Sequence, residues 1–282
     1  MGPTRVLTGY RGCDFDHYDD GVCMPSWIAE LVRLDGSDQS YRTSATFGAG
    51  PRLFGGLIAA QALAAAAATV DPDRLPQSLH AYFIKGGRIG VDIEYTVELT
   101  RDGRSFNTRR VTAVQDGAAI FEMMASFHRP ETTTDWQCSE PPAVTLQEAV
   151  PLPGLPEKWA DHFELRIAPG EPVDWPRQPF WFRTREPVED DPVLQACALT
   201  FISDIGLVSA GRPPGAELPG PGGAASLDHA LWLHRPTDVH QWHLYDAAAV
   251  SHSDARGLAR GTMRRADGTL VASVAQESLW RL

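Results

Sequence analysis

The chain has 282 residues, of which 43% are hydrophobic and 22% are charged, and its formal net charge at pH 7 is −11. This balance is typical of a globular protein with one large domain or two ordinary ones, and it argues against extensive disorder. The acidic charge disfavours nucleic acid or an anionic membrane as a general partner, so an anionic ligand would need a local basic patch.

The sequence predicts a cytoplasmic protein. Residues 1–20 are polar and acidic, where a secretory signal would be basic and then apolar. The longest apolar run, residues 57–70, is mostly alanine and shorter than the ~20 strongly apolar residues that span a bilayer. We expect no disulfide, metal or cofactor, because the cysteines lack CxxC spacing and neighbouring histidines: Cys13, Cys23, Cys138 and Cys197.

The first half of the chain predicts one helix followed by antiparallel strands. A glycine-rich turn over residues 48–56 precedes residues 57–69, which are almost all Ala and Leu and end at Asp71 and Pro72. A helix that is apolar on every side must be covered by other elements, so this helix is central. Segments rich in β-branched and aromatic residues, separated by glycine turns, then predict four strands, over residues 78–84, 91–100, 105–114 and 118–128.

Residues 132–179 are rich in proline and predict a connector that contains one candidate strand, residues 163–167. The second half then repeats the element order of the first. Pro192 suits the first turn of another apolar helix, residues 193–208. A glycine- and proline-rich loop over 211–223 leads to predicted strands at residues 226–230, 241–250, 255–264 and 269–281.

The two halves also agree in detail. Placing Gly268 on Gly117 sets Gln276 on Ala125, and the segment from Ser226 echoes the segment from Ser78. We therefore predict an α+β protein made of one unit used twice. Its divisions are an amino-terminal repeat, residues 1–135, a connector, residues 136–179, and a carboxy-terminal repeat, residues 180–282.

Asp204 is the most informative polar residue, because it lies on a helix apolar enough to be buried. An isolated buried carboxylate costs several kcal/mol unless it has partners, lines a cleft or has a shifted pKa. A functional carboxylate and an ordinary one at the exposed helix end, or beside a basic residue, are equally open interpretations.

Two further residues break the repeat. Ser226 is the first residue of a predicted strand, and the residue pattern alone indicates an ordinary serine at a strand edge. Gln276 lies among apolar residues on one strand face, and the residue pattern alone favours a core glutamine bonded to backbone. Asp228 and His229 are interpreted as structural, since adjacent strand residues point to opposite faces and both cannot enter one site.

Several ordered motifs in both halves resemble the acyl-CoA thioesterase II family. They cover roughly residues 43–131 and 192–282 and include Phe54-Gly55-Gly56, Arg101-Asp102-Gly103-Arg104, Ser203-Asp204, Asp228 to Pro236, Ala255-Arg256-Gly257 and Gln276-Glu277. The resemblance implies a double hotdog fold, in which each repeat wraps an antiparallel sheet around a long helix. It also implies hydrolysis of acyl-CoA to a free acid and CoA. The chain departs from the family pattern at three places. Many relatives have threonine where this chain has Ser226, and they often have an Arg-Pro-Gly turn where it has Lys85-Gly86-Gly87. The proline-rich connector has no clear match in the family.

Carried over residue by residue, the resemblance implies that Asp204, Ser226 and Gln276 hold the attacking water. Backbone N–H groups at the first helix, of Gly56 and Leu57, are candidate donors to the thioester oxygen. Candidate CoA-binding residues lie on matching hairpins and are Arg104, Arg109, Arg256 and Arg260. The predicted partner is acyl-CoA, and neither nucleic acid nor a membrane is expected as a partner. The sequence leaves open whether the chain forms a homo-oligomer.

Rival functions fit less well. The sequence lacks the Gly-x-Ser-x-Gly elbow of serine hydrolases, and no lysine follows Gly55-Gly56 as a phosphate loop would need. The alternative is a non-hydrolytic thioester-binding module or a hotdog dehydratase, because fold alone does not settle function. A dehydratase would be expected to carry a histidine on a central helix, and neither apolar helix contains one.

Overall fold

The computed structural model describes residues 24–44, 47–49, 52–138, 144–153, 157–169, 177–213, 215–216 and 222–281. Part of the predicted glycine-rich turn and of the 211–223 loop lies outside these residues, as do Cys13 and Cys23.

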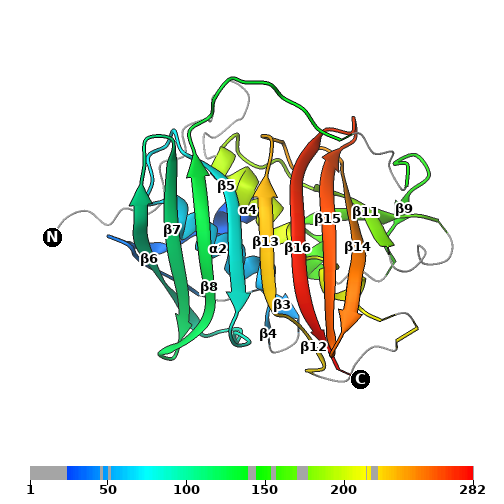
Figure 1. The fold of residues 1–282 in the computed structure, drawn as a ribbon, viewed down its shortest axis with the longest axis horizontal. Coiled ribbons are helices and arrows are strands. Elements are labelled where there is room, and N and C mark those ends of the chain that lie inside the picture. The colour runs from blue at the N-terminus through cyan, green and yellow to red at the C-terminus, as the bar shows by residue number, and fades with distance from the viewer. Residues whose placement is uncertain are drawn as a thin grey trace.

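One long antiparallel sheet dominates the molecule (Figure 1). Its strands lie in the order β1-β2-β6-β7-β8-β5-β13-β16-β15-β14-β11-β10-β9, and β12 pairs with β16. The strands of the first half are β1 (Asp35–Ser37), β2 (Ser40–Ser44), β5 (Leu75–Phe83), β6 (Asp92–Asp102), β7 (Phe106–Gln115) and β8 (Ala118–His128). Those of the second half are β9 (Val150–Pro151), β10 (Phe163–Ile167), β11 (Arg177–Thr184), β12 (Ala224–Ser226), β13 (Asp228–Leu233), β14 (His243–Ser253), β15 (Arg256–Arg265) and β16 (Leu270–Trp280).

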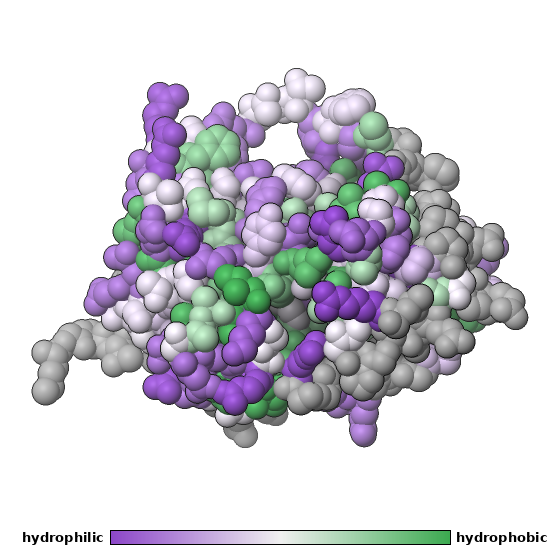
Figure 2. Space-filling model, turned by 60° about the horizontal axis from the view of Figure 1, so that its bottom comes forward, coloured by the Kyte–Doolittle hydropathy of each residue, from purple (hydrophilic) through white to green (hydrophobic). Residues whose placement is uncertain are grey.

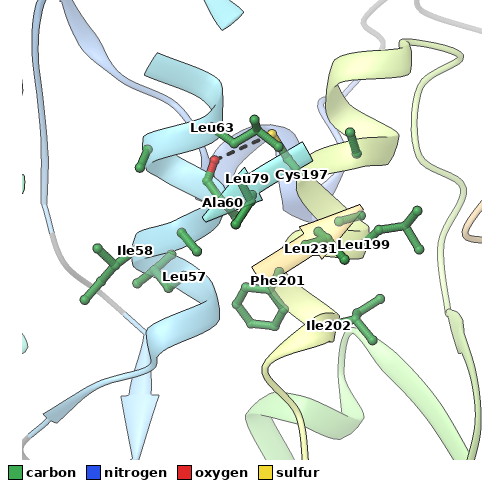
Figure 3. Close-up of a cluster of buried hydrophobic side chains, with 14 of the residues drawn as sticks. Leu57, Ile58, Ala60, Leu63, Leu79, Cys197, Leu199, Phe201, Ile202 and Leu231 are labelled. Carbon is green, nitrogen blue, oxygen red and sulfur yellow. Dashed lines mark hydrogen bonds between the residues drawn. The ribbon is translucent and has the colours of Figure 1, made fainter. Parts of the chain in front are cut away.

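Two apolar helices, α2 (Gly55–Ala67) and α4 (Pro192–Ser203), lie on one face of this sheet (Figure 1). They run side by side in opposite directions, and the thiol of Cys197 lies 3.6 Å from the carbonyl oxygen of Ala60 (Figure 3). Shorter elements are α1 (Trp27–Leu31), α3 (Glu157–Ala160), α5 (Leu207–Ala210) and the ribbon of β3 (Gly48–Ala49) and β4 (Arg52–Leu53). The core fills the space between the helices and the sheet.

The stretch Pro192–Ala210 is apolar and long enough to cross a membrane, but 72% of its apolar window is buried inside the protein. This stretch, which contains α4 and α5, is therefore part of the core of this fold. Asp191 caps its start, because the side chain accepts hydrogen bonds from the N–H groups of Val193 and Leu194. Phe54 precedes α2 and supplies no such side-chain cap.

The α+β layout and the two helix-and-sheet repeats are confirmed. The repeats join where β5 pairs with β13 at the centre of the sheet. Arg109 of β7 faces Ala125 of β8, and Ala259 of β15 faces Gln276 of β16, so the ladders match Gln276 with Ala125 as expected.

The match between the central strands needs a correction. Leu79 of β5 lies opposite Ala125, and Ala230 of β13 lies opposite Ala275. The next position along β13, His229, therefore lies beside Gln276 and corresponds to Leu79, and Ser226 corresponds to Pro76, whereas the sequence echo matched Ser226 with Ser78. Leu79 is a buried core residue, so His229 in the matching place points toward the helices, where it contacts Ser203.

Other expectations also change. The second helix ends at Ser203, earlier than predicted, because Gly206 adopts a left-handed conformation (φ 82°) and starts α5. The candidate strand at residues 163–167 is confirmed as β10. It pairs with β11 and β9, so the proline-rich segment contributes strands to the second repeat's side of the sheet. The elements α1, β1 and β2 were not predicted.

Candidate active site

Asp204 lies at the carboxy-terminal end of α4, at the point where α4 meets the beginning of α2. The residue caps α4 and is only 7% exposed. Its Oδ2 accepts a hydrogen bond of 3.0 Å from the backbone N–H of Gly56. This bond satisfies one of the free N–H groups at the start of α2, which no local side chain caps.

Ser226 and Gln276 complete a connected polar group with Asp204. The Ser226 hydroxyl donates to Asp204 Oδ1 at 3.2 Å. Gln276 is fully buried, and its Nε2 donates to the Ser226 hydroxyl at 3.0 Å and to the Ser278 hydroxyl at 3.3 Å. The three side chains that the resemblance indicated, from α4, β12 and β16, therefore lie together.

Burial gives the Asp204 carboxyl an unusual proton affinity. Removal from water raises its pKa to about 6, and hydrogen bonds from Ser226, the Gly56 backbone and Gln276 oppose this rise. Asp204 is 7% exposed, so it does not lie at an exposed helix end, and in the described part of the chain no basic side chain forms an ion pair with it. A carboxylate with this pKa accepts a proton more readily than one in water, while staying ionised at neutral pH.

His229 is a buried member of this group that the sequence analysis set aside. It is 1% exposed, and its Nδ1 lies 2.7 Å from Gln276 Oε1. Its Nε2 lies 2.7 Å from the hydroxyl of Ser203, the residue before Asp204. Asp228 behaves as expected of a structural residue, since its Oδ1 accepts the N–H of Glu277.

The sequence held a signal for His229. Leu231 is a core residue two positions further along β13, and residues two apart on a strand share a face. His229 therefore had to point inward with Leu231. Gln276 was expected to bond to backbone, yet the structure satisfies it with side chains of His229, Ser226 and Ser278.

The two predicted donors to the thioester oxygen are not supported. The Gly56 N–H is bonded to Asp204, and the Leu57 N–H donates to the carbonyl oxygen of Phe54 at 3.2 Å. Both groups already have acceptors in this structure. The start of α2 instead stabilises the carboxylate of Asp204, because the N-terminal end of a helix favours negative charge.

The four candidate CoA-binding arginines separate into distinct places. Arg109 is 1% exposed, and its guanidinium donates to the Thr69 carbonyl and hydroxyl beyond α2 and to Asp102. It holds the fold together and is not available to a phosphate. Arg104 is exposed, but its carbonyl accepts from Arg74, which also follows α2. A helix of 13 residues is about 20 Å long, so both lie at the far end of α2 from Asp204.

Arg256 and Arg260 lie on β15 in the second repeat. Ser226 and the neighbour of Arg256, Gly257, both pair with Ser278, so Arg256 begins β15 at the same end of the sheet as Ser226. Its guanidinium lies 3.7 Å from both Asp254 and Glu277, and 45% of the side chain is exposed. Arg260 is also exposed, and since its neighbour Ala259 points inward, its side chain lies on the outer face of the sheet.

The surface at this end of the molecule is mixed in character. Figure 2 brings the end with β4 and β12 toward the viewer and shows a group of hydrophobic residues near the middle of the face, with hydrophilic residues around it. A cavity of about 370 Å³ lies at the opposite end, where its lining includes Pro76, Pro192, Leu199 and Leu233. In the repeat, Pro76 takes the place of Ser226, so this cavity lies on the side that lacks the polar group.

Metal and disulfide chemistry find no support in the described residues. In that part of the chain no cluster of three or more His, Cys, Asp or Glu side chains could hold a metal ion. Cys138 and Cys197 are free, and burial raises the pKa of the Cys197 thiol well above its usual value.

Comparisons with known proteins agree across most of the chain. The models of the acyl-CoA thioesterase N-terminal and C-terminal domains match residues 43–128 and 137–280. Acyl-coenzyme A thioesterase 8 of Rattus norvegicus is 34% identical over 266 residues, which cover 82% of this chain and 80% of that protein.

Solved structures extend the likeness to the fold. An acyl-CoA thioesterase II from Mycobacterium marinum is 36% identical with a TM-score of 0.74, over 90% of this chain and 96% of that one. A protein from Alicyclobacillus acidocaldarius described as having a hot dog fold is 20% identical, with a TM-score of 0.73 over 92% of this chain and 99% of that one. The double hotdog fold is thereby confirmed.

Proposed function

Because this chain belongs to the acyl-CoA thioesterase family and hydrolyses acyl-CoA to a carboxylic acid and free CoA, we propose that Asp204, Ser226 and Gln276 hold the attacking water. The observation that carries this assignment is the buried hydrogen-bonded group from Gly56 through Asp204 and Ser226 to Gln276. It joins Ser226 and Gln276, which the family resemblance indicated for the water, to the Asp204 carboxyl, whose pKa is raised.

In the proposed reaction Asp204 acts as the general base. It takes one proton from the water as the water oxygen bonds to the thioester carbonyl carbon. The carbon–sulfur bond then breaks, and the sulfur leaves with the bonding electrons and takes up that proton to give CoA thiol. The acyl group departs as the carboxylic acid, so no covalent acyl-enzyme is needed.

Ser226 and Gln276 orient the water and the base in this proposal. The Ser226 hydroxyl directs its hydrogen at Asp204, and Gln276 directs an amide hydrogen at Ser226. Holding a reactant in one geometry lowers the barrier even though neither group gains or loses a proton.

The test measures release of free thiol from a series of acyl-CoA substrates. Asp204→Asn keeps the shape of the side chain and removes the base, so kcat should fall by roughly 100-fold or more while KM changes little. Ser226→Ala and Gln276→Ala should lower kcat less. The matched control is Asp190→Asn, an exposed carboxyl at the opposite end of α4. Near wild-type turnover by Asp204→Asn would show that the base lies elsewhere.

A further inference from the structure

The buried imidazole of His229 contacts the proposed centre without touching Asp204 or Ser226. Its two nitrogens each have one partner at 2.7 Å, Gln276 Oε1 and the Ser203 hydroxyl. It links the end of α4, where Asp204 lies, to the middle of β16, where Gln276 lies. We propose that His229 is a positioning residue that fixes the orientation of the Gln276 side-chain amide, an inference that rests on the proposed function.

The orientation of Gln276 decides what Ser226 can do. An amide has an oxygen that only accepts and a nitrogen that only donates. With Oε1 toward His229, Nε2 donates to Ser226, so the Ser226 hydrogen is free to point at Asp204. If the amide were turned over, Oε1 would attract the Ser226 hydrogen away from Asp204.

A neutral His229 with its hydrogen on Nδ1 matches the first of these arrangements. Burial lowers its pKa to about 4, against the opposing hydrogen bond with Gln276, so the ring is neutral at physiological pH. A neutral imidazole carries one hydrogen, and Gln276 Oε1 can only accept, so the hydrogen lies on Nδ1. Nε2 then carries no hydrogen and lies 2.7 Å from the Ser203 hydroxyl, which donates its hydrogen to the Thr200 carbonyl at 2.7 Å.

With the hydrogen on Nδ1, the donors run in one direction, from His229 through Gln276 and Ser226 to Asp204. Ser203 is itself held in place, because the Tyr245 hydroxyl donates to its backbone carbonyl at 2.7 Å. This arrangement is absent from the first repeat, where Leu79 and Ala125 take the places of His229 and Gln276. The imidazole accompanies the polar group and is missing from the repeat that lacks it.

Two substitutions of similar polarity separate the roles of the two ring nitrogens. The amide nitrogen of asparagine can occupy the place of Nδ1, so His229→Asn keeps a donor for Gln276. Glutamine reaches the place of Nε2, so His229→Gln keeps a partner for Ser203 and loses the donor. We expect kcat of His229→Gln to fall roughly 10-fold or more below that of His229→Asn, with KM similar in both. Equal turnover, or the reverse order, would overturn the proposal.

A double variant tests whether His229 acts through Gln276. If it does, adding His229→Gln to Gln276→Ala should lower kcat little further, because the group that His229 orients is already gone. Additive losses would contradict this role. The matched control is His80→Gln on the adjacent strand, an exposed imidazole that stacks on the edge of Trp232 and should leave kcat unchanged.

A measurement on the wild-type protein needs no folded variant. Nitrogen NMR of the protein labelled with ¹⁵N in histidine distinguishes a hydrogen on Nδ1 from one on Nε2. The Nδ1–H form is expected for His229 across neutral pH, and the Nε2–H form would overturn the inference. The two proposals fail separately: retained turnover by Asp204→Asn refutes the proposed function, whereas loss in Asp204→Asn with equal His229 variants refutes only the inference.

Discussion

The carboxylate of Asp204 is held by the backbone N–H of Gly56, a residue 148 positions earlier in the chain. One residue ends the central helix of the second repeat, and the other begins the central helix of the first. The proposed centre is therefore built by both repeats, although all its polar side chains come from the second. Because α2 and α4 pack antiparallel, the N-terminal end of α2 lies beside the Asp204 carboxylate at the C-terminal end of α4.

Hydrolysis should depend on pH in the range where Asp204 titrates. With a pKa of about 6, the carboxyl is ionised and able to accept a proton above that pH and is protonated below it. We expect kcat/KM to fall as pH drops through about 6, with a slope of one proton. Steady-state rates of thiol release between pH 5 and 8 measure this, and a profile that is flat across pH 6 would contradict the role of Asp204.

Ser226 should influence the same titration. Its hydrogen bond is the largest of the contributions that lower the Asp204 pKa against the effect of burial. Ser226→Ala removes that bond, so the fall of kcat/KM at acid pH should occur at higher pH than in the wild type. The maximal kcat/KM should also be lower. A limb that stays in place in Ser226→Ala would show that the hydroxyl does not bond to the titrating group.

Asp204 should also lower the stability of the fold at neutral pH. Its pKa in the folded protein is raised above the unfolded value, so its favourable contribution is present below pH 4 and is lost as pH rises through about 6. A difference of about two pKa units corresponds to on the order of 2–3 kcal/mol. Asp204→Asn should therefore raise the free energy of unfolding in urea by that order at pH 8.

The pH dependence provides the control for this stability gain. Between pH 5 and pH 8 the gain in Asp204→Asn should grow, because more of the wild-type carboxyl must be ionised in a buried position at the higher pH. Asp190→Asn replaces an exposed side chain, so its effect on the free energy of unfolding should not increase between pH 5 and pH 8. A stability of Asp204→Asn equal to that of the wild type at pH 8 would mean that burial does not penalise this carboxylate.

A methyl group at Gly55 should disturb the proposed base without removing any of the three polar side chains. A Cβ at this position would lie 2.6 Å from Asp204 Oδ2 and 2.7 Å from the Phe83 ring. Gly55→Ala should therefore displace the carboxylate and lower kcat roughly 10- to 100-fold, since small misplacements of reacting groups are costly. Gly86→Ala is the control, because its Cβ would meet nothing closer than 3.6 Å. Unchanged kcat in Gly55→Ala would refute tight packing around Asp204.

Much of this fold could be predicted because its signals are local. The strand over residues 118–128 and the candidate strand at 163–167 have the bounds that the residue pattern gave. The second central helix was predicted to end at residue 208 and ends at Ser203, because its end depends on the left-handed backbone of Gly206, which an apolar run does not reveal. The inward face of His229 was missed because Asp228 and His229 were interpreted together as structural, although His229 shares a strand face with the core residue Leu231. The sequence did not reveal that Arg109 is buried, because its burial depends on a tertiary contact with Thr69.

The remaining basic candidates predict where the anionic part of CoA binds. Arg256 lies at the same end of the sheet as Ser226, whereas Arg104 lies at the far end of α2. Screening limits the repulsion from a net charge of −11 to about 8 Å at physiological salt, so side chains near the phosphates decide binding. If Arg256 contacts a phosphate, Arg256→Glu should raise KM for acyl-CoA several-fold. It should change KM much less for a short thioester without the nucleotide, and Arg104→Glu should change neither. Equal effects of Arg256→Glu on both substrates would show that its bonds to Asp254 and Glu277 support the fold alone.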